Sequence, residues 1–417
     1  MSFHHARRHS SRGLGIALMA VGCLLSGQSL ANAGEVTFSQ ALQRAQENNP
    51  NMAAAKWQVD ISQAERRQAG LIPNPELSWE VEDTRSDTRT TTVQLTQPIE
   101  LGGKRGARVE VAQRGIDLAA LGLEQYRNGL RAEVIQAFYG ALQAGMRVEL
   151  AEQSRQIAQR ALGIAQGRVK AGKVSPIELT RAQVQLAELD LEATRAQRDR
   201  RIAEDRLQLV MGQGSVSELR PQGDATRLPE VPATSRLLSA LAASAELRSA
   251  QTAIEQQEAS FALEKTQRIP DLNVSLGSQY SAADRERVNL VGLSMPLPLF
   301  NRNQGNILAA ARRADQSRDL RNAAELRLRN EIQVAAAQWQ SAQVEIQAFE
   351  STILPSAQQA VDSTARGFEM GKFAFLDVLD AQRTLIQSRA QYIQSLAAAT
   401  DSWVQLERVL GDISVIR

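Results

Sequence analysis

One sequence pattern occurs twice in the chain and constrains its fold more than any other feature. "AGKVSPIELTRAQ" begins at Ala171 and "MGKFAFLDVLDAQ" begins at Met370, 199 residues later. Both copies place a carboxylate five residues after a Gly-Lys pair and Ala-Gln four residues further on. A repeat of this length is a duplicated half-molecule rather than a solenoid unit of about 20 to 50 residues. We therefore expect each half to contain the same elements in the same order.

Further matches extend the repeat along the chain. At the same offset Gly212 matches Gly411, and "LGGKRGARV" in the first half faces "LFNRNQGNI" in the second. The expected segments are an export signal (1–33), a first repeat (34–212), a linker or equatorial segment (213–233) and a second repeat (234–417).

Within each half we expect a helix, a β-hairpin, a very long helix and a returning helix. Apolar Leu77, Trp79 and Val81 alternate with polar residues, which is typical of a half-buried strand. In the second half, adjacent Leu290 and Val291 leave the phase of the last strand ambiguous. The expected ranges are, for the first half, a helix at about 38–70, a hairpin at about 76–97 and a coiled-coil hairpin at about 104–211, and for the second half about 234–268, 271–295 and 305–411.

The long helices dominate this architecture. No proline interrupts 104–169, and about 66 residues at about 1.5 Å each span about 100 Å. The corresponding helix over 305–370 contains Pro355, where we expect a kink. Apolar residues three and four apart over 179–210 predict a coiled-coil seam. The fold class is therefore mainly α with a small β part: two long helical hairpins plus two β-hairpins.

The N-terminal residues predict an export signal. Three arginines precede the apolar run Leu14 to Leu25, and Ala31-Asn32-Ala33 is a small-x-small cleavage pattern. An alternative is a lipoprotein site at Cys23. Cleavage after Ala33 would remove every histidine and the only cysteine. Zinc or copper sites built from imidazole or thiolate, and Ser-His or Cys-His catalysis, are then excluded, so we expect no enzyme activity, no metal site and no cofactor.

The repeated pattern itself predicts a tight turn between two helices. Gly172 can adopt the positive φ that ends a helix, and Ser175, Pro176 and Glu178 fit the N-cap, the first helical position and the capping-box position. One interpretation is that these residues are turn and cap chemistry only. The second copy nevertheless retains a carboxylate at Asp377 and adds Asp380, one helical turn later, where the first copy has Arg181.

The strands predict that the chain assembles. Four strands cannot close a barrel, open sheet edges do not occur in lipid, and about eight strands form the smallest membrane barrel. Three chains would supply twelve strands. We therefore expect a homotrimeric tube, with a 12-stranded β-barrel in the outer membrane continued by an α-helical barrel in the periplasm. Tip aspartates would form carboxylate rings that attract cations and constrict the pore.

These features resemble the TolC family of outer-membrane efflux channels, in particular its heavy-metal (CzcC-like, cobalt-zinc-cadmium) branch. The resemblance covers essentially the whole chain after the signal. Four stretches carry it: "QPIELGGKRGARV", "AGKVSPIELTRAQ", "MGKFAFLDVLDAQRTL" and "LERVLG".

The resemblance implies a channel in a tripartite efflux system, with a periplasmic adaptor (membrane fusion) protein and an inner-membrane RND pump as partners. It implies a periplasmic gate at Asp377 and Asp380, with Glu178 as the first-copy equivalent. Some family members lock this gate with an arginine two residues after the second-turn glycine, where this chain has Phe373. The adaptor-contacting turn residues it implies are Gly172, Lys173, Ser175, Pro176, Gly371, Lys372 and Phe373.

The resemblance implies export of heavy-metal cations such as cobalt, zinc and cadmium, and two alternatives stay open. The first is an outer-membrane channel for organic drugs or toxicants. The second is a soluble periplasmic coiled-coil scaffold, which would not need alternating hairpins at matching places in both halves and would fractionate without detergent. The net charge after signal removal is close to zero, which gives no support to nucleic-acid binding.

Overall fold

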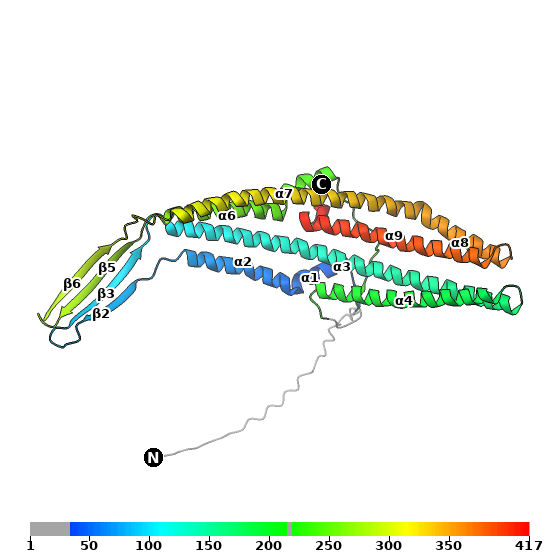
Figure 1. The fold of residues 1–417 in the computed structure, drawn as a ribbon, viewed down its shortest axis with the longest axis horizontal. Helices are drawn as coiled ribbons and strands as arrows, with labels where there is room; N and C mark the ends of the chain where they lie inside the picture. The colour runs from blue at the N-terminus through cyan, green and yellow to red at the C-terminus, as the bar shows by residue number, and fades with distance from the viewer. Residues whose placement is uncertain (1–33, 215–218, 417) are drawn as a thin grey trace, which may run out of the picture. The chain divides into compact units, whose positions relative to one another are not determined.

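The computed structural model describes residues 34–214 and 219–416, and Figure 1 shows its ribbon. The expected export signal and the alternative lipoprotein site at Cys23 lie outside the described residues. The helices are α1 (Phe38–Asn48), α2 (Pro50–Ala69), α3 (Lys104–Lys170), α4 (Pro176–Val210), α5 (Thr234–Ala240), α6 (Ala245–Thr266), α7 (Gln304–Ala348), α8 (Leu354–Glu369) and α9 (Phe375–Leu410). The strands are β1 (Glu35–Val36), β2 (Glu76–Glu82), β3 (Thr90–Ile99), β4 (Arg220–Pro221), β5 (Leu272–Ser281) and β6 (Glu286–Ser294).

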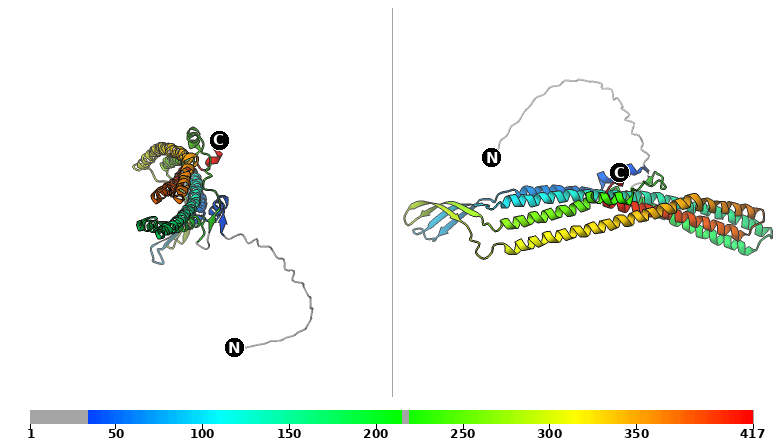
Figure 2. Two further views of the ribbon diagram at one scale, coloured as in Figure 1. Left: turned by 90° about the vertical axis from the view of Figure 1, so that its right-hand side faces the viewer. Right: turned by 90° about the horizontal axis from the view of Figure 1, so that it is seen from above.

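Helix α3 is the longest described helix, and most of the other long helices pack against it. It packs against α2 and α6 on the side of the sheet, and against α4 and α9 toward the opposite end (Figure 1). Its 67 residues span about 100 Å at about 1.5 Å each. Viewed along their length, the helices form a curved row (Figure 2). The expectation of a mainly helical chain with a small β part is confirmed.

Two helices that we expected to be continuous are interrupted. Pro50 restricts Asn49 to an extended conformation, and the Asn49 side chain caps α2 by accepting from the N–H groups of Asn51 and Met52. In the second half the helix expected over 234–268 breaks at Ser244, whose hydroxyl caps α6. Both expectations were wrong because a local side-chain cap replaces the helical hydrogen bonds there.

The interruption expected at Pro355 is present. A π-helical turn, Phe349–Ile353, separates α7 from α8 directly before this proline. Proline lacks the N–H that would continue the helical ladder, and a widened turn is one way in which a helix accommodates that loss.

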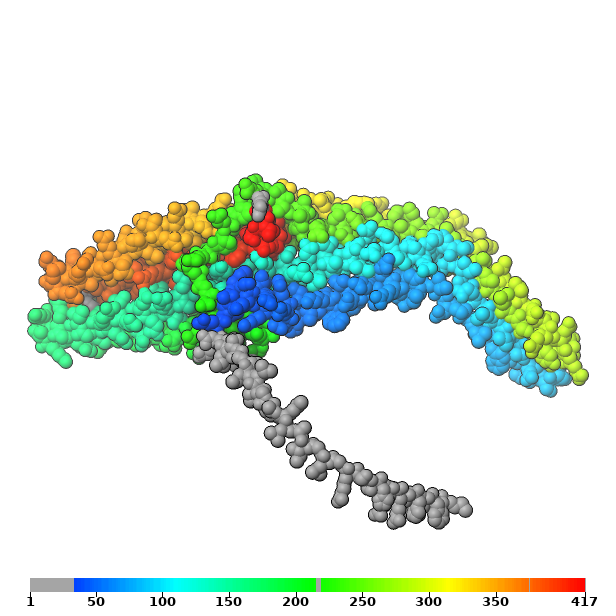
Figure 3. Space-filling model, turned by 180° about the vertical axis from the view of Figure 1, so that it is seen from behind, coloured from blue at the N-terminus to red at the C-terminus, as the bar shows by residue number. Residues whose placement is uncertain are grey.

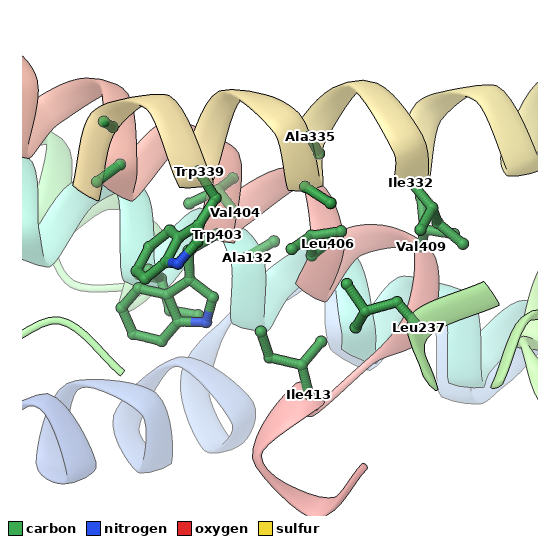
Figure 4. Close-up of a cluster of buried hydrophobic side chains, with 14 of the residues drawn as sticks. Ala132, Leu237, Ile332, Ala335, Trp339, Trp403, Val404, Leu406, Val409 and Ile413 are labelled. Atoms are coloured by element: carbon green, nitrogen blue, oxygen red, sulfur yellow. The ribbon is translucent and has the colours of Figure 1, made fainter. Parts of the chain in front are cut away.

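The largest buried cluster lies about halfway along the row of helices, where α3, α7 and α9 pack together. Trp339 of α7, Trp403 and Leu406 of α9, and Ile413 lie together there (Figure 4). Leu228 packs against this core. Phe38 of α1 contacts Trp403 of α9, and Figure 3 shows the blue start of the described chain beside the red end of α9. Away from this centre the core becomes alanine-rich, as between α3 and α4. Small side chains let the two helices approach closely, which suits a long, narrow coiled coil.

The four longer strands form one antiparallel sheet in the order β2-β3-β5-β6. One row across it contains Leu77, Leu95, Leu276 and Val291, each paired with the next. Their exposed fractions are 71%, 46%, 57% and 77%, so one face of the sheet is apolar and uncovered in a single chain. Leu290 pairs with Gly277 and lies on the other face, which resolves the ambiguous phase of β6.

The outer edges of the sheet are β2 and β6, and neither edge has a strand partner among the described residues. No helix in 34–214 or 219–416 is long and apolar enough to cross a membrane.

Candidate functional site

The two copies of the repeated pattern form neighbouring turns at the end of the helices farthest from the sheet (Figure 1). A small buried cluster joins all four helices that meet there. It consists of Ala161 and Ala165 of α3, Ala182 of α4, Phe368 of α8, and Val378 and Leu379 of α9.

The first turn ends α3 with a glycine in the left-handed region. Gly172 has φ +66°, its N–H donates to the carbonyl of Val169 at 2.9 Å, and the Lys173 N–H donates to the carbonyl of Arg168 at 2.9 Å. These two bonds define a Schellman motif, which satisfies carbonyls at the helix end. Lys173 is exposed at the tip.

The second turn has the same backbone. Gly371 has φ +76°, its N–H donates to the carbonyl of Phe368 at 2.9 Å, and the Lys372 N–H donates to the carbonyl of Gly367 at 2.8 Å. The glycine of this pair therefore recurs because each turn needs a residue that readily adopts a positive φ at that position. Lys372 is exposed, like its counterpart.

The helices that leave the turns are capped in different ways. Pro176 begins α4, and the Ser175 hydroxyl accepts from the Ile177 N–H at 3.4 Å. At α9 the carboxylate of Asp377 accepts from the Ala374 N–H at 2.8 Å. The expected reciprocal capping box of Ser175 with Glu178 is not formed, because the hydroxyl reaches the second helical N–H instead of the third.

Aromatic contacts that the sequence did not reveal hold the turns in place. The Arg168 guanidinium lies 4.3 Å from the ring centroid of Phe368, which ties the end of α3 to the end of α8. The ring of Phe373 packs so closely on Gly367 that a Cβ there would overlap it. Phe373, at the position where some channels have an arginine, therefore packs within its own turn.

The candidate gate carboxylates are not all in one place. Asp377 and Asp380 are exposed, and Glu178 is half-buried on α4. Asp380 lines a groove of about 500 Å³ between α4 and α9, and neither Asp377 nor Glu178 lines it. Arg181, Glu188 and Arg383 line the same groove, so it carries charges of both signs.

Arg181 and Asp380 occupy equivalent positions of the two repeats and face one groove. Comparison of the two repeats identified this difference, but it did not show that both positions line one groove. Among the described residues, no group of three or more histidine, cysteine, aspartate or glutamate side chains is arranged to hold a metal ion.

Comparison with known proteins places these features in a family. The family model for outer membrane efflux protein matches residues 41–213 and 237–412. Cobalt-zinc-cadmium resistance protein CzcC of Cupriavidus metallidurans is 38% identical over 379 residues, which are 91% of this chain and 91% of that protein. Nickel-cobalt-cadmium resistance protein NccC of Alcaligenes xylosoxydans xylosoxydans is 27% identical over 307 residues, 72% of this chain and 68% of that protein.

The fold is shared with solved structures at lower identity. The outer membrane protein VceC from Vibrio cholerae superposes with a TM-score of 0.74 at 19% identity, covering 90% of this chain and 96% of that one. The family match spans both halves of the chain, each with its long helical hairpin. The chain therefore belongs to the outer membrane efflux protein family.

Proposed function

We propose that three copies of this chain form an outer-membrane channel that exports heavy-metal cations. The observation that carries the proposal is the four-stranded sheet, which has one exposed apolar face and two edges without a strand partner in the described part of the chain. Pairing β6 of one copy with β2 of the next removes every edge, and three copies give a closed barrel of 12 strands. Such a barrel satisfies the backbone in lipid and places Leu77 and Val291 against acyl chains.

The curved row of helices supports the second part of the tube. Its two edge helices at the tip end, α4 and α8, would meet across the boundary between copies, so that three rows close into an α-helical barrel. This barrel extends about 100 Å from the sheet, far enough to place the tip turns deep in the periplasm. The exposed Lys173 and Lys372 are then available to a periplasmic adaptor protein, and through it to an inner-membrane RND pump.

We infer that the tip is also the gate. Asp380 faces the groove between α4 and α9, and three copies would bring three such carboxylates around the pore axis, where they attract cations. Asp377 contributes charge and also caps α9. Glu178 is the half-buried first-repeat equivalent. The chain acts as a conduit rather than an enzyme, and the energy for transport comes from the pump.

The cargo is inferred from the relatives, whose names report cobalt-zinc-cadmium and nickel-cobalt-cadmium resistance. Divalent cations suit a carboxylate-lined entrance in a chain without histidine or cysteine after residue 33, because carboxylates bind hydrated cations weakly enough to release them.

Measuring the metal content of cells tests this function. Elemental mass spectrometry would compare a deletion strain with its complemented parent after challenge with zinc, cobalt, cadmium, nickel, copper and silver. We expect the divalent metals to accumulate in the deletion strain and to return to the parental level on complementation. Normal metal content, together with new sensitivity to dyes or detergents, would overturn the metal cargo and leave an organic efflux channel.

A further inference from the structure

Exposed apolar side chains continue along the chain beyond the end of β6. Val291, Leu293, Met295, Leu297 and Leu299 occupy alternate positions, and their exposed fractions are 77%, 70%, 46%, 74% and 64%. Only the first two belong to the strand. The apolar strip therefore runs from the sheet into the connection that leads to α7.

This strip ends at a hollow of about 660 Å³ between α6, α7 and the connecting segment. Its apolar lining includes Phe261 of α6, Leu308 of α7, and Leu299 and Phe300 of the connection. Phe300 is 90% exposed, an unusual state for a phenylalanine next to three other large apolar side chains. A surface of this size and character indicates a binding site for an apolar group.

Two arginines, Arg268 and Arg302, line the same hollow, and no carboxylate does. Among the described residues neither guanidinium forms an ion pair, and the Arg302 Nε donates only to the carbonyl of Pro298 at 3.3 Å. The nearby acid, Glu264, accepts from the amide of Asn303 at 2.6 Å. The hollow therefore joins an apolar wall to two cationic groups that have no counter-ion within 34–214 or 219–416.

The first repeat lacks this arrangement. Gly102 and Lys104 stand where the second repeat has Phe300 and Arg302. Lys104 is buried, and its Nζ lies 2.7 Å from Asp271. The first junction is thus closed by an internal ion pair, whereas the second leaves its aromatic and basic side chains exposed.

We propose that the hollow binds a glycerophospholipid of the membrane leaflet that faces the periplasm. Arg268 and Arg302 contact the phosphate, because guanidinium groups bind phosphate oxygens in a bidentate manner. Phe300 and Phe261 pack against the glycerol end of the acyl chains, which continue along Leu297 toward the apolar face of the sheet. This inference rests on the proposed function, since it requires the sheet to lie in a membrane.

The phosphate contact is tested by measuring lipid binding to the purified full-length protein in detergent. Native mass spectrometry would titrate the wild type with 1-palmitoyl-2-oleoyl-phosphatidylglycerol and compare it with the Arg268→Gln/Arg302→Gln double variant. We expect about a tenfold or greater loss of lipid affinity, because two charged hydrogen-bond donors are removed. Arg105→Gln is the matched control, because Arg105 is an exposed arginine at the first junction. The lipid affinity of this variant should equal that of the wild type. Equal affinity in the double variant would overturn the site.

Two further measurements distinguish a bound lipid from other possible occupants of the hollow. Inorganic phosphate in large excess should not displace the lipid; displacement would indicate a site for free phosphate and overturn the proposal. Phe300→Ser should weaken lipid binding and leave the oligomer intact. If it dissociates the oligomer instead, a second copy of the chain covers the hollow and the proposal fails.

The same spectra distinguish this inference from the proposed function. A trimer mass for the wild type supports the channel proposal whatever the lipid result. A wild type without trimers would contradict the channel proposal, while the comparison of wild type with the double variant would still decide whether the arginines bind lipid phosphate.

Discussion

Replacing Arg131 should destabilise the chain through a carboxylate that the fold buries almost completely. Glu407 of α9 is 1% exposed, and its carboxylate accepts from Arg131 Nε of α3 at 2.7 Å and from Trp403 Nε1 at 2.9 Å. Arg131 also contacts Asp412 at 3.0 Å. Arg131→Met keeps most of the apolar stem of the side chain but leaves Glu407 without its cation.

The size of the effect follows from this burial. Removing one partner of a buried ion pair costs about 3–5 kcal/mol. An unfolding entropy of about 2.1 cal/mol/K per residue gives about 0.8 kcal/mol/K for about 380 residues, so the apparent Tm should fall by about 4–6 °C. Thermal unfolding of the detergent-solubilised protein, followed by circular dichroism, measures this shift.

The pH dependence has a definite sign. Burial raises the pKa of the Glu407 carboxyl group. Hydrogen bonds from Arg131 and Trp403 oppose that rise, and the negative charge of Asp412 adds to it. A carboxyl group whose folded-state pKa is raised contributes stability that is present below its unfolded pKa, near 4.5, and is lost as pH rises through the folded pKa. Removing Arg131 raises the folded pKa of Glu407 further. The deficit of the variant should therefore be smaller at pH 5 than at pH 8.

The control is Arg127→Met, because Arg127 lies one helical turn earlier on α3 and is exposed. It should unfold within about 1 °C of the wild type, since surface substitutions usually change stability by less than about 0.5 kcal/mol. Equal losses in the two variants, or the same deficit of Arg131→Met at pH 5 and pH 8, would refute the assignment to a buried, unpaired Glu407.

Three further predictions concern the tips. Gly172→Ala should cost about 1 kcal/mol, because a Cβ is strained at φ +66° although nothing contacts it; an unchanged Tm would contradict this. Asp380→Ala, alone and with Asp377→Ala, should raise single-channel conductance in planar bilayers and weaken block by divalent cations, and the double variant should also lose about 1 kcal/mol with the α9 cap. Unchanged conductance would remove these carboxylates from the gate. Charge reversal of Lys173 and Lys372 to glutamate should reduce chemical cross-linking to the adaptor while trimers persist; normal cross-linking would exclude them from that interface.

Local sequence chemistry predicted the turns well because short-range rules govern them. Gly172 and Gly371 are followed by new helix starts, and the Schellman geometry needs only residues within six positions of each other. The strands were also readable, since a period of two places Leu77 and Trp79 on one face. The Asn49-Pro50 break was equally local and could have been found, because proline restricts the residue before it.

Long-range contacts could not be read from the sequence. Arg131 and Glu407 are 276 residues apart, and nothing in their neighbours indicates that they pair. The ordering of the sheet, in which β3 of one repeat pairs with β5 of the other, is likewise set by how the halves pack. The groove that brings Arg181 and Asp380 together depends on the relative rotation of α4 and α9, which a repeat comparison does not contain.

The two turns at the tip share the same backbone conformation but carry different charged side chains. This difference bears on how a gate at the tip would work. If both turns carried the second-copy sequence, a closed ring of three chains would present six equivalent carboxylates, and their repulsion would hold the tip open. Placing Arg181 where the other repeat has Asp380 puts a cation and an anion in the same groove of each chain. In the proposed trimer, charges of opposite sign at alternate positions around the ring would let the tip close without a net excess of like charge. In that proposed gate, opening would separate Arg181 from Asp380, and a partner that contacts only one of the two turns of each chain would shift the balance between closed and open tips.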